Sequence, residues 1–161
     1  MDFKPNLTPK QIFEKGSFGG TYWRPIHSSV TGKDYRNQHK KFKFLKNINE
    51  NKLTRTDYDK SLNKYGVKVG SSLEEWEESG WITKYDPYGW VQWYCNYYEG
   101  RRTPDDLRQI RRWQGINGRF KIRLINMIKE KGATYDDYSV SPKIRQTLLH
   151  WGIEITKEDI M

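Results

Sequence analysis

Residues 86–115 read DPYGWVQWYCNYYEGRRTPDDLRQIRRWQG, and this stretch decides the fold. Twice in it a residue that can cap a helix precedes a proline, at Asp86-Pro87 and at Thr103-Pro104, and proline suits the first position of a helix. A glycine, the residue that commonly ends a helix, follows about one helix length later, at Gly100 and at Gly115. This punctuation predicts two consecutive helices.

The two predicted helices differ in the side chains that they gather on their faces. In the first, the helical period places Trp90, Val91, Trp93, Tyr94, Tyr97 and Tyr98 on one side and Gln92, Asn96 and Glu99 on the other. In the second, Leu107, Ile110 and Trp113 face one way and Arg108, Arg111 and Arg112 face the opposite way. We therefore assign to the core an aromatic face made of Trp90, Trp93, Tyr94 and Tyr97, and place the arginines on the surface.

Similar signals predict further helices on both sides of this stretch. They run from Pro9 to Gly16, from a capping box at Ser71–Glu75 to Gly80, from 118 to 131, and from Pro142 to Gly152. On the last of these, Ile144, Leu148 and Trp151 are expected to face inward, with Lys143, Gln146 and His150 on the other side. Residues 71–152 thus form a helical region.

Residues 1–70 are less regular. Glycine, proline and serine alternate there with aromatic and β-branched residues, which predicts loops and one or two short strands. Residues 33–46 form a basic segment, either mobile or a helix with a solvated face, whose cations are Lys33, Arg36, Lys40, Lys41, Lys43 and Lys46. The whole pattern predicts a mainly α fold, α+β with a minor strand element, as one compact domain over residues 1–161.

Composition limits the core and the class of partner. Seven Trp, eleven Tyr and six Phe against a single alanine, Ala133, predict a core filled by aromatic side chains. A net charge of +9 predicts a polyanionic partner, with nucleic acid ahead of a membrane surface. No apolar stretch is long enough to span a bilayer, the first residues lack a secretory signal, and Cys95 is the only cysteine. We expect a protein that is not secreted and works in the nucleus or cytoplasm; its oligomeric state is not indicated.

The strongest functional signal is a cluster of cations around the second predicted helix. Its members are Arg101, Arg102, Arg108, Arg111, Arg112, Arg119, Lys121 and Arg123. Only two acids, Asp105 and Asp106, lie among them, and both stand in a first helical turn, where carboxylates favour the helix dipole. With a short turn over residues 114–117, the pattern resembles a helix-turn-helix and predicts nucleic-acid binding through an arginine-rich helix pair, to DNA in preference to RNA.

The arginines also allow a structural interpretation, and the glycine-rich stretch suggests a second candidate site. The arginines can instead form a solvated face or pair with the acidic stretch Glu74, Glu75, Glu77 and Glu78. The glycine-rich stretch GSFGGT, residues 16–21, and the residues after it suggest a small pocket formed by Gly19, Gly20, Tyr22, Arg24 and His27. A tight turn that needs positive φ explains the same glycines without any ligand.

An enzyme acting on nucleic acid is the rival interpretation. A nuclease would use the acid pairs Asp105-Asp106 or Asp136-Asp137 with Mg²⁺, although adjacent acids on a helix point apart. A DNA glycosylase would need one well-placed aspartate and an aromatic pocket. No spacing of cysteine and histidine indicates a bound metal, and no motif indicates a cofactor. A packaging or scaffold protein that binds an acidic partner is the third possibility.

Three stretches also resemble a known family. They are GSFGGTYWRPIHSSVTGKDY, SLEEWEESGWITKYDPYGWVQWYCNYYEGRRTPDDLRQIRRW and SVSPKIRQTLLHWGIEIT, and together they cover about half of the chain. The sequences of these stretches are similar to those of a family of short uncharacterised proteins of large DNA viruses and fungi. The resemblance implies an intracellular role in a virus or a eukaryote, and no activity or catalytic residue carries over from it.

Overall fold

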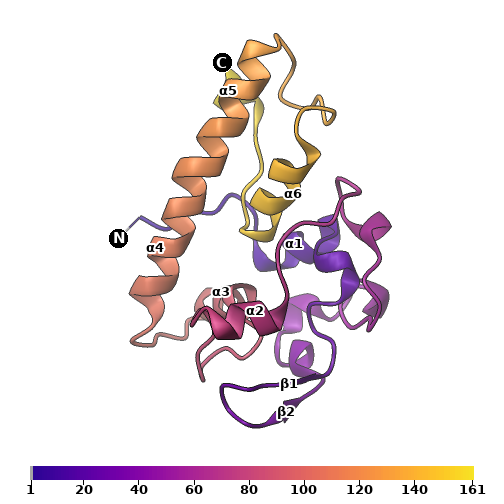
Figure 1. Ribbon diagram of the computed structural model, residues 1–161, viewed down its shortest axis with the longest axis vertical. Helices are drawn as coiled ribbons and strands as arrows, with labels where there is room; N and C mark the ends of the chain where they lie inside the picture. The colour runs from indigo at the N-terminus through magenta and orange to yellow at the C-terminus, as the bar shows by residue number, and fades with distance from the viewer. Residues whose placement is uncertain (1) are drawn as a thin grey trace.

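The computed structural model describes residues 2–161, and a long helix dominates it (Figure 1). This long helix consists of α4 (Asp106–Ile116), a π-helical turn η6 (Asn117–Lys121) and α5 (Ile122–Glu130), which follow one another without a break. The predicted turn over residues 114–117 is therefore wrong, and so is the helix-turn-helix. Gly115 and Gly118 do not end a helix here, because neither has the positive φ that a helix-ending glycine adopts.

The aromatic helix α3 (Trp90–Tyr98) lies at the centre of the core. Trp93 is fully buried, Trp90 and Tyr94 nearly so, and Tyr97 packs against them, as predicted for these four residues. The prediction is wrong for Tyr98, which is 54% exposed, and for Gln92, which is buried. The helix begins later than predicted, because Gly89 takes up a φ of +102° and the side chain of Gln92 accepts a hydrogen bond from the Tyr88 N–H.

Polar tips of the buried aromatic residues connect α3 to the rest of the chain. Phe3, near the N-terminus, packs edge-on against a ring of aromatic side chains at centroid distances of 5.1–6.2 Å, made of Trp90, Trp93, Tyr94, Tyr97 and Trp113. Hydrogen bonds of 2.7–3.2 Å then join Trp90 to the Gln109 carbonyl, Trp93 to Asp106, Tyr94 to the Leu7 carbonyl and Trp113 to the Trp151 carbonyl. The aromatic core thus fixes the positions of the N-terminal segment, the long helix and the end of α6.

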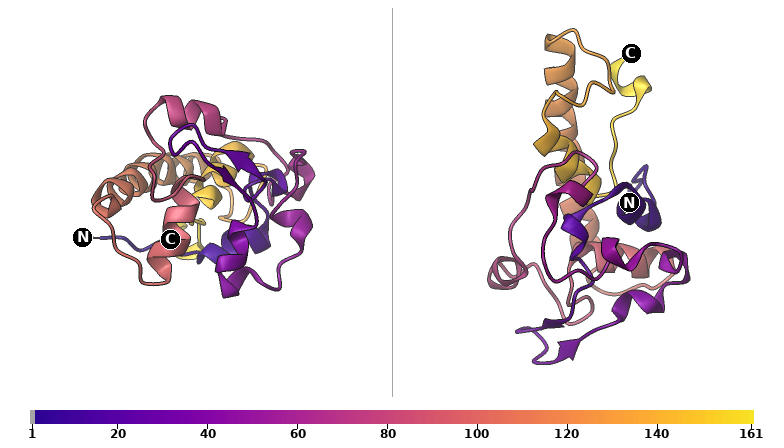
Figure 2. Two further views of the ribbon diagram at one scale, coloured as in Figure 1. Left: turned by 90° about the horizontal axis from the view of Figure 1, so that it is seen from below. Right: turned by 90° about the vertical axis from the view of Figure 1, so that its right-hand side faces the viewer.

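Residues 2–70 combine a short helix, two strands and several 3-10 turns, in agreement with the predicted irregular region. The region contains α1 (Pro9–Lys15), the antiparallel strands β1 (Ile26–His27) and β2 (Asp34–Tyr35), and the 3-10 turns η1 (Phe18–Gly20), η2 (Gln38–Lys41), η3 (Lys43–Leu45), η4 (Glu50–Lys52) and η5 (Lys60–Leu62). The hairpin lies at the opposite end of the molecule from the C-terminus (Figures 1 and 2). The basic segment 33–46 is not an α-helix: its cations are exposed, while His39, Phe42 and Leu45 are buried.

Three more helices complete the fold: α2 (Leu73–Glu78), α6 (Pro142–His150) and the short α7 (Lys157–Ile160). Ser72 caps α2 and Ser141 caps α6, as the sequence indicated. The predicted outer side of α6 is confirmed for Lys143, which is exposed, and wrong for Gln146 and His150, which are buried. The Gln146 amide donates to the Gly16 carbonyl and accepts from the Tyr65 N–H, so its burial is stabilised by partners far away in the sequence.

The helices of this fold differ from what a membrane-spanning helix requires. Across residues 2–161, none combines the length and the apolar composition that crossing a bilayer requires. Other helices pack along the second half of the long helix: α6 contacts η6, and α7 contacts α5 (Figure 2). The long helix, the end of α6 and the segment around α2 together form the pocket that is described next.

Candidate functional site

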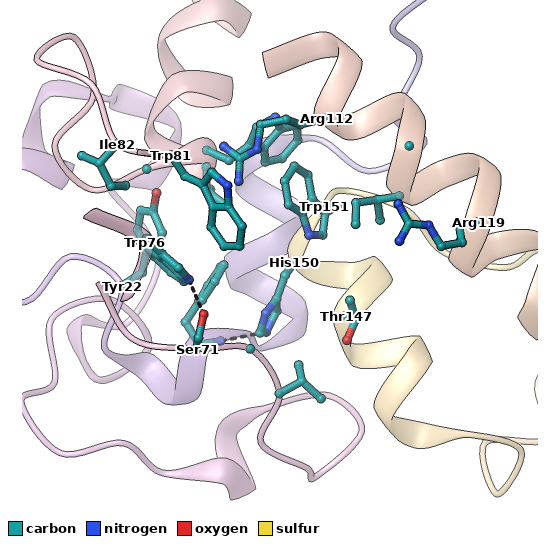
Figure 3. A pocket seen from close by; sticks show the side chains of 18 of the residues that line it. Tyr22, Ser71, Trp76, Trp81, Ile82, Arg112, Arg119, Thr147, His150 and Trp151 are labelled. Atoms are coloured by element: carbon teal, nitrogen blue, oxygen red, sulfur yellow. Dashed lines mark hydrogen bonds between the residues drawn. The ribbon is translucent and has the colours of Figure 1, made fainter. Parts of the chain in front are cut away.

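A pocket of about 510 Å³ lies where the long helix, the end of α6 and the segment around α2 come together (Figure 3). Its lining is mostly aromatic and apolar, with three arginines on one side. The residues that line it are Phe18, Tyr22, Val69, Gly70, Ser71, Trp76, Trp81, Ile82, Gly89, Trp90, Val91, Arg111, Arg112, Gly115, Ile116, Arg119, Thr147, His150 and Trp151. We refer to it as the aromatic pocket.

Three tryptophans give the aromatic pocket its character. Trp76 lies on α2, and its indole N–H donates to the Ser71 hydroxyl at 3.0 Å. Trp81 follows α2 through a backbone hydrogen bond to the Trp76 carbonyl, and its side chain is 42% exposed. Trp151, at the end of α6, packs on Trp90 of the core with ring centroids 4.7 Å apart. Three flat apolar faces thus meet in one place, two of them carried by the segment around α2.

Arg112 enters the aromatic pocket between two of these indoles (Figure 3). Its guanidinium carbon is 5.3 Å from the Trp81 ring centroid and 5.2 Å from that of Trp151, within the range of cation–π attraction. Its Nη1 donates to the Gln109 side chain at 2.9 Å. Among residues 2–161, no carboxylate lies within 4 Å of it. Burial, with the nearby charge of Arg108, lowers the pKa of Arg112 to about 10.

The same face of the long helix carries two more free cations. Arg111 and Arg119 are exposed, line the aromatic pocket, and make no ion pair within the part of the chain that the structure describes. Gly115 lies between them on this face, one turn from each, and an added Cβ there would meet no atom within 4 Å. Arg119 belongs to the π-helical turn, a rare feature that is frequent at functional sites. The helix therefore presents a gap flanked by guanidinium groups.

His150 forms part of the floor of the aromatic pocket. Its Nε2 accepts from the Phe18 N–H at 3.2 Å and faces the Gln146 amide at 3.3 Å, and its ring stacks on Phe18 at 4.0 Å. Burial lowers the pKa of His150 to about 3, so the ring is neutral at physiological pH. Because Nε2 acts as acceptor, the ring proton resides on Nδ1, which has no protein partner among residues 2–161.

The structure divides the eight predicted nucleic-acid contacts into groups. Three cations are held in ion pairs: Arg101 with Asp86, Arg108 with Asp105, and Lys121 with Asp159. Arg102 stacks 3.7 Å above the Tyr97 ring and donates to two backbone carbonyls. Arg123 is exposed on α5, away from the pocket lining. Only Arg111, Arg112 and Arg119 line the aromatic pocket. Leu107, expected in the core, is 43% exposed.

The small pocket suggested by the glycine-rich stretch is divided in the structure. Tyr22 lines the aromatic pocket, and Arg24 lines an adjoining hollow of about 400 Å³ that shares Tyr22, Trp76 and His150 with it. Gly19 and Gly20 are instead buried in a tight turn with positive φ, where an added Cβ would lie 2.4 Å from Tyr58 or 2.5 Å from the Asn51 carbonyl. His27 is exposed on the hairpin and bonded to Asp34.

The acids proposed for a nuclease have structural partners. Asp105 binds Arg108, and Asp106 accepts from Thr103 and from the Trp93 indole. Asp136 and Asp137 accept hydrogen bonds from hydroxyl groups of their own loop. Within residues 2–161, no three metal-ligating side chains come together as a metal site would need. No acidic side chain lines the aromatic pocket.

Sequence reasoning missed two members of the site. Trp76 and Trp81 stand in SLEEWEESGW, a stretch that was interpreted only as an acidic helix. Their importance is visible only when α2 is placed beside Trp151, which lies far along the chain. The available signal was the presence of two tryptophans in a strongly polar stretch.

A matched pair of substitutions separates structural arginines from free ones. Arg101 forms a bidentate ion pair with Asp86, which is 1% exposed, so Arg101→Met leaves a buried carboxylate unpaired and should lower the free energy of unfolding by about 3 kcal/mol. Arg112→Met removes no ion pair and keeps the apolar stem, so the change should stay within about 1 kcal/mol. Urea denaturation measures both; equal losses would contradict the distinction.

The neutral His150 predicts a pH dependence of stability. Its folded pKa of about 3 lies below the unfolded value, so the unfolded chain takes up a proton first as the pH falls below about 6.5. Its contribution is complete above that pH and declines toward pH 3, by up to about 1.4 kcal/mol per pH unit. His150→Gln, whose amide oxygen can accept from Phe18, should flatten the decline between pH 6.5 and 4.5. An unchanged slope in urea titrations would contradict a lowered pKa of His150 in the folded state.

Similarity to other proteins adds nothing to this geometry. A comparison of the chain with protein-family models, with curated proteins and with solved structures found no match. Inferences about function therefore depend on the chemistry of the aromatic pocket.

Proposed function

We propose that the protein binds nucleic acid as a single strand, with backbone phosphates held by Arg111, Arg112 and Arg119 at the edge of the aromatic pocket. One observation carries the proposal: the Arg112 guanidinium lies between two indoles and has no carboxylate partner in residues 2–161. A partly buried cation is normally paired, and here burial already lowers its pKa. An anion supplied by a ligand would complete the site.

Phosphate is the anion that this site suits best. The planar guanidinium matches two oxygens of a phosphate group, and three guanidiniums on one helix face can contact neighbouring phosphates of a flexible strand. The aromatic rings beside them support the same partner, because single-strand-binding sites combine a basic groove with side chains on which bases stack. The net charge of +9 adds long-range attraction for any polyanion.

The pocket supports binding better than hydrolysis. A nuclease or glycosylase needs a carboxylate or another general base at the reacting group, and no carboxylate lines the pocket. His150 is held neutral, with its acceptor nitrogen already engaged by Phe18. Phosphate and base are common to DNA and RNA, so the proposed site accepts a strand of either.

Anisotropy titrations with labelled 15-residue strands of DNA and RNA test the proposal. The double variant Arg112→Gln/Arg119→Gln should bind at least tenfold more weakly, and the slope of log K against log salt should shrink by about 0.7 for each phosphate contact removed. The matched control is Lys129→Gln/Lys131→Gln, which removes the same charge from exposed residues beyond the pocket. It should keep affinity within about twofold.

Two results would contradict the proposal. Equal losses in both double variants would mean that net charge alone attracts the strand. Competition by polyglutamate as effective as that by unlabelled oligonucleotide would indicate an acidic protein partner instead, the role of a scaffold.

A further inference from the structure

The aromatic pocket has a shape and a polarity that a phosphate contact alone does not explain. We infer that it receives one unstacked base of the bound strand, against the indoles of Trp76, Trp81 and Trp151. This inference rests on the proposed function and adds to it the part of the nucleotide that enters the cavity. About 510 Å³ is space enough for a base and its sugar, and falls in the usual range of ligand pockets.

The charges around the indoles exclude a quaternary ammonium group, a ligand that aromatic cages commonly bind. Three tryptophan faces can hold a quaternary ammonium group by cation–π attraction. Here the Arg112 guanidinium already lies 5.3 Å and 5.2 Å from the Trp81 and Trp151 ring centroids, and no acidic side chain lines the cavity. A second cation would be repelled. A flat, neutral ring that carries an anionic group is the complementary ligand, and a nucleotide has both parts.

Gly115 provides the opening for this ring in the wall of the pocket. A glycine within a helix lowers its stability relative to alanine, and the backbone here is helical, so the fold does not require glycine. The space beyond its Cα is empty and continuous with the pocket. Arg111 and Arg119 flank it one turn to either side, so a base that enters past Gly115 leaves its phosphates beside both guanidiniums.

His150 supplies a polar group at the inner end. Its side chain is more than nine-tenths buried, its Nε2 is used by the protein, and the Nδ1–H is a donor without a partner in residues 2–161. Figure 3 places His150 on the side of the pocket opposite Arg112. A base that lies between them can accept this hydrogen bond through a carbonyl oxygen or a ring nitrogen while its phosphate stays at the arginines.

The test compares two strands that differ only in their bases. A labelled ten-residue oligothymidine and a strand of ten abasic residues carry the same phosphates, and anisotropy gives the affinity of the full chain for each. The inference predicts at least tenfold tighter binding of the strand with bases, the size expected for base stacking on aromatic side chains.

Two glycines of the long helix provide matched variants. Gly115→Leu fills the pocket, and Gly118→Leu adds the same side chain to a neighbouring helical glycine that also has open space but does not line the pocket. Both should fold, with melting temperatures no lower than that of the unmodified protein, because leucine favours helix. Gly115→Leu and, independently, Trp81→Leu should abolish the preference for bases, whereas Gly118→Leu and the off-pocket Tyr98→Leu should retain it.

Each other outcome overturns a defined part of the account. Equal affinity for both strands, still dependent on Arg112 and Arg119, would overturn the base pocket and leave the proposed function intact. A preference for bases that survives in Gly115→Leu and Trp81→Leu would place the stacking elsewhere. Failure of both strands to bind would overturn the proposed function itself.

Discussion

The structure depends on the hydrogen bonds that the polar tips of buried aromatic residues make to other segments of the chain. A core filled by tryptophan and tyrosine carries polar tips into its interior, and an unmade hydrogen bond there costs about 1–3 kcal/mol. Trp90, Trp93, Tyr94 and Trp113 make such bonds to partners on other segments, so each tip determines where another part of the chain lies. The bond from Trp113 to the Trp151 carbonyl sets the end of α6 against the long helix and thereby places one wall of the pocket.

The cations of the chain divide by the presence or absence of a carboxylate partner. Arg101 and Arg108 have one and support the fold, Arg101 most of all because Asp86 is buried. Arg112 is more enclosed than an unpaired arginine normally is, and it keeps its position through stacking and one neutral hydrogen bond. A partly buried guanidinium group that has no carboxylate partner is typical of a binding site.

Local signals in the sequence predicted the helices better than their connections. Capping residues and prolines placed α1, α2 and α6, and periodicity identified the aromatic face of α3. Gly115 and Gly118 resembled a helix end, but the packing of α6 against η6 and of α7 against α5 keeps the chain helical through them. That contact joins distant segments, and no local pattern encodes it.

The candidate site was predictable only in part for the same reason. The sequence singled out Arg111, Arg112 and Arg119 as cations, but could not show that Arg101 and Lys121 have carboxylate partners at other places in the chain. Arg108 pairs locally, with Asp105 three residues before it. Helical periodicity predicts His150 on the outer side of α6, whereas the Phe18 N–H and the Gln146 amide stabilise it inside. Trp76 and Trp81 gain their role from a neighbour, Trp151, about seventy residues away.

The most direct test of the central claim is a crystal structure of the protein bound to a short oligothymidine. The account predicts one thymine against Trp81 or Trp151, within hydrogen-bonding distance of His150 Nδ1, and a phosphate oxygen within about 3 Å of the Arg112 guanidinium. A strand that lies on another surface, with the aromatic pocket still holding only solvent, would contradict it.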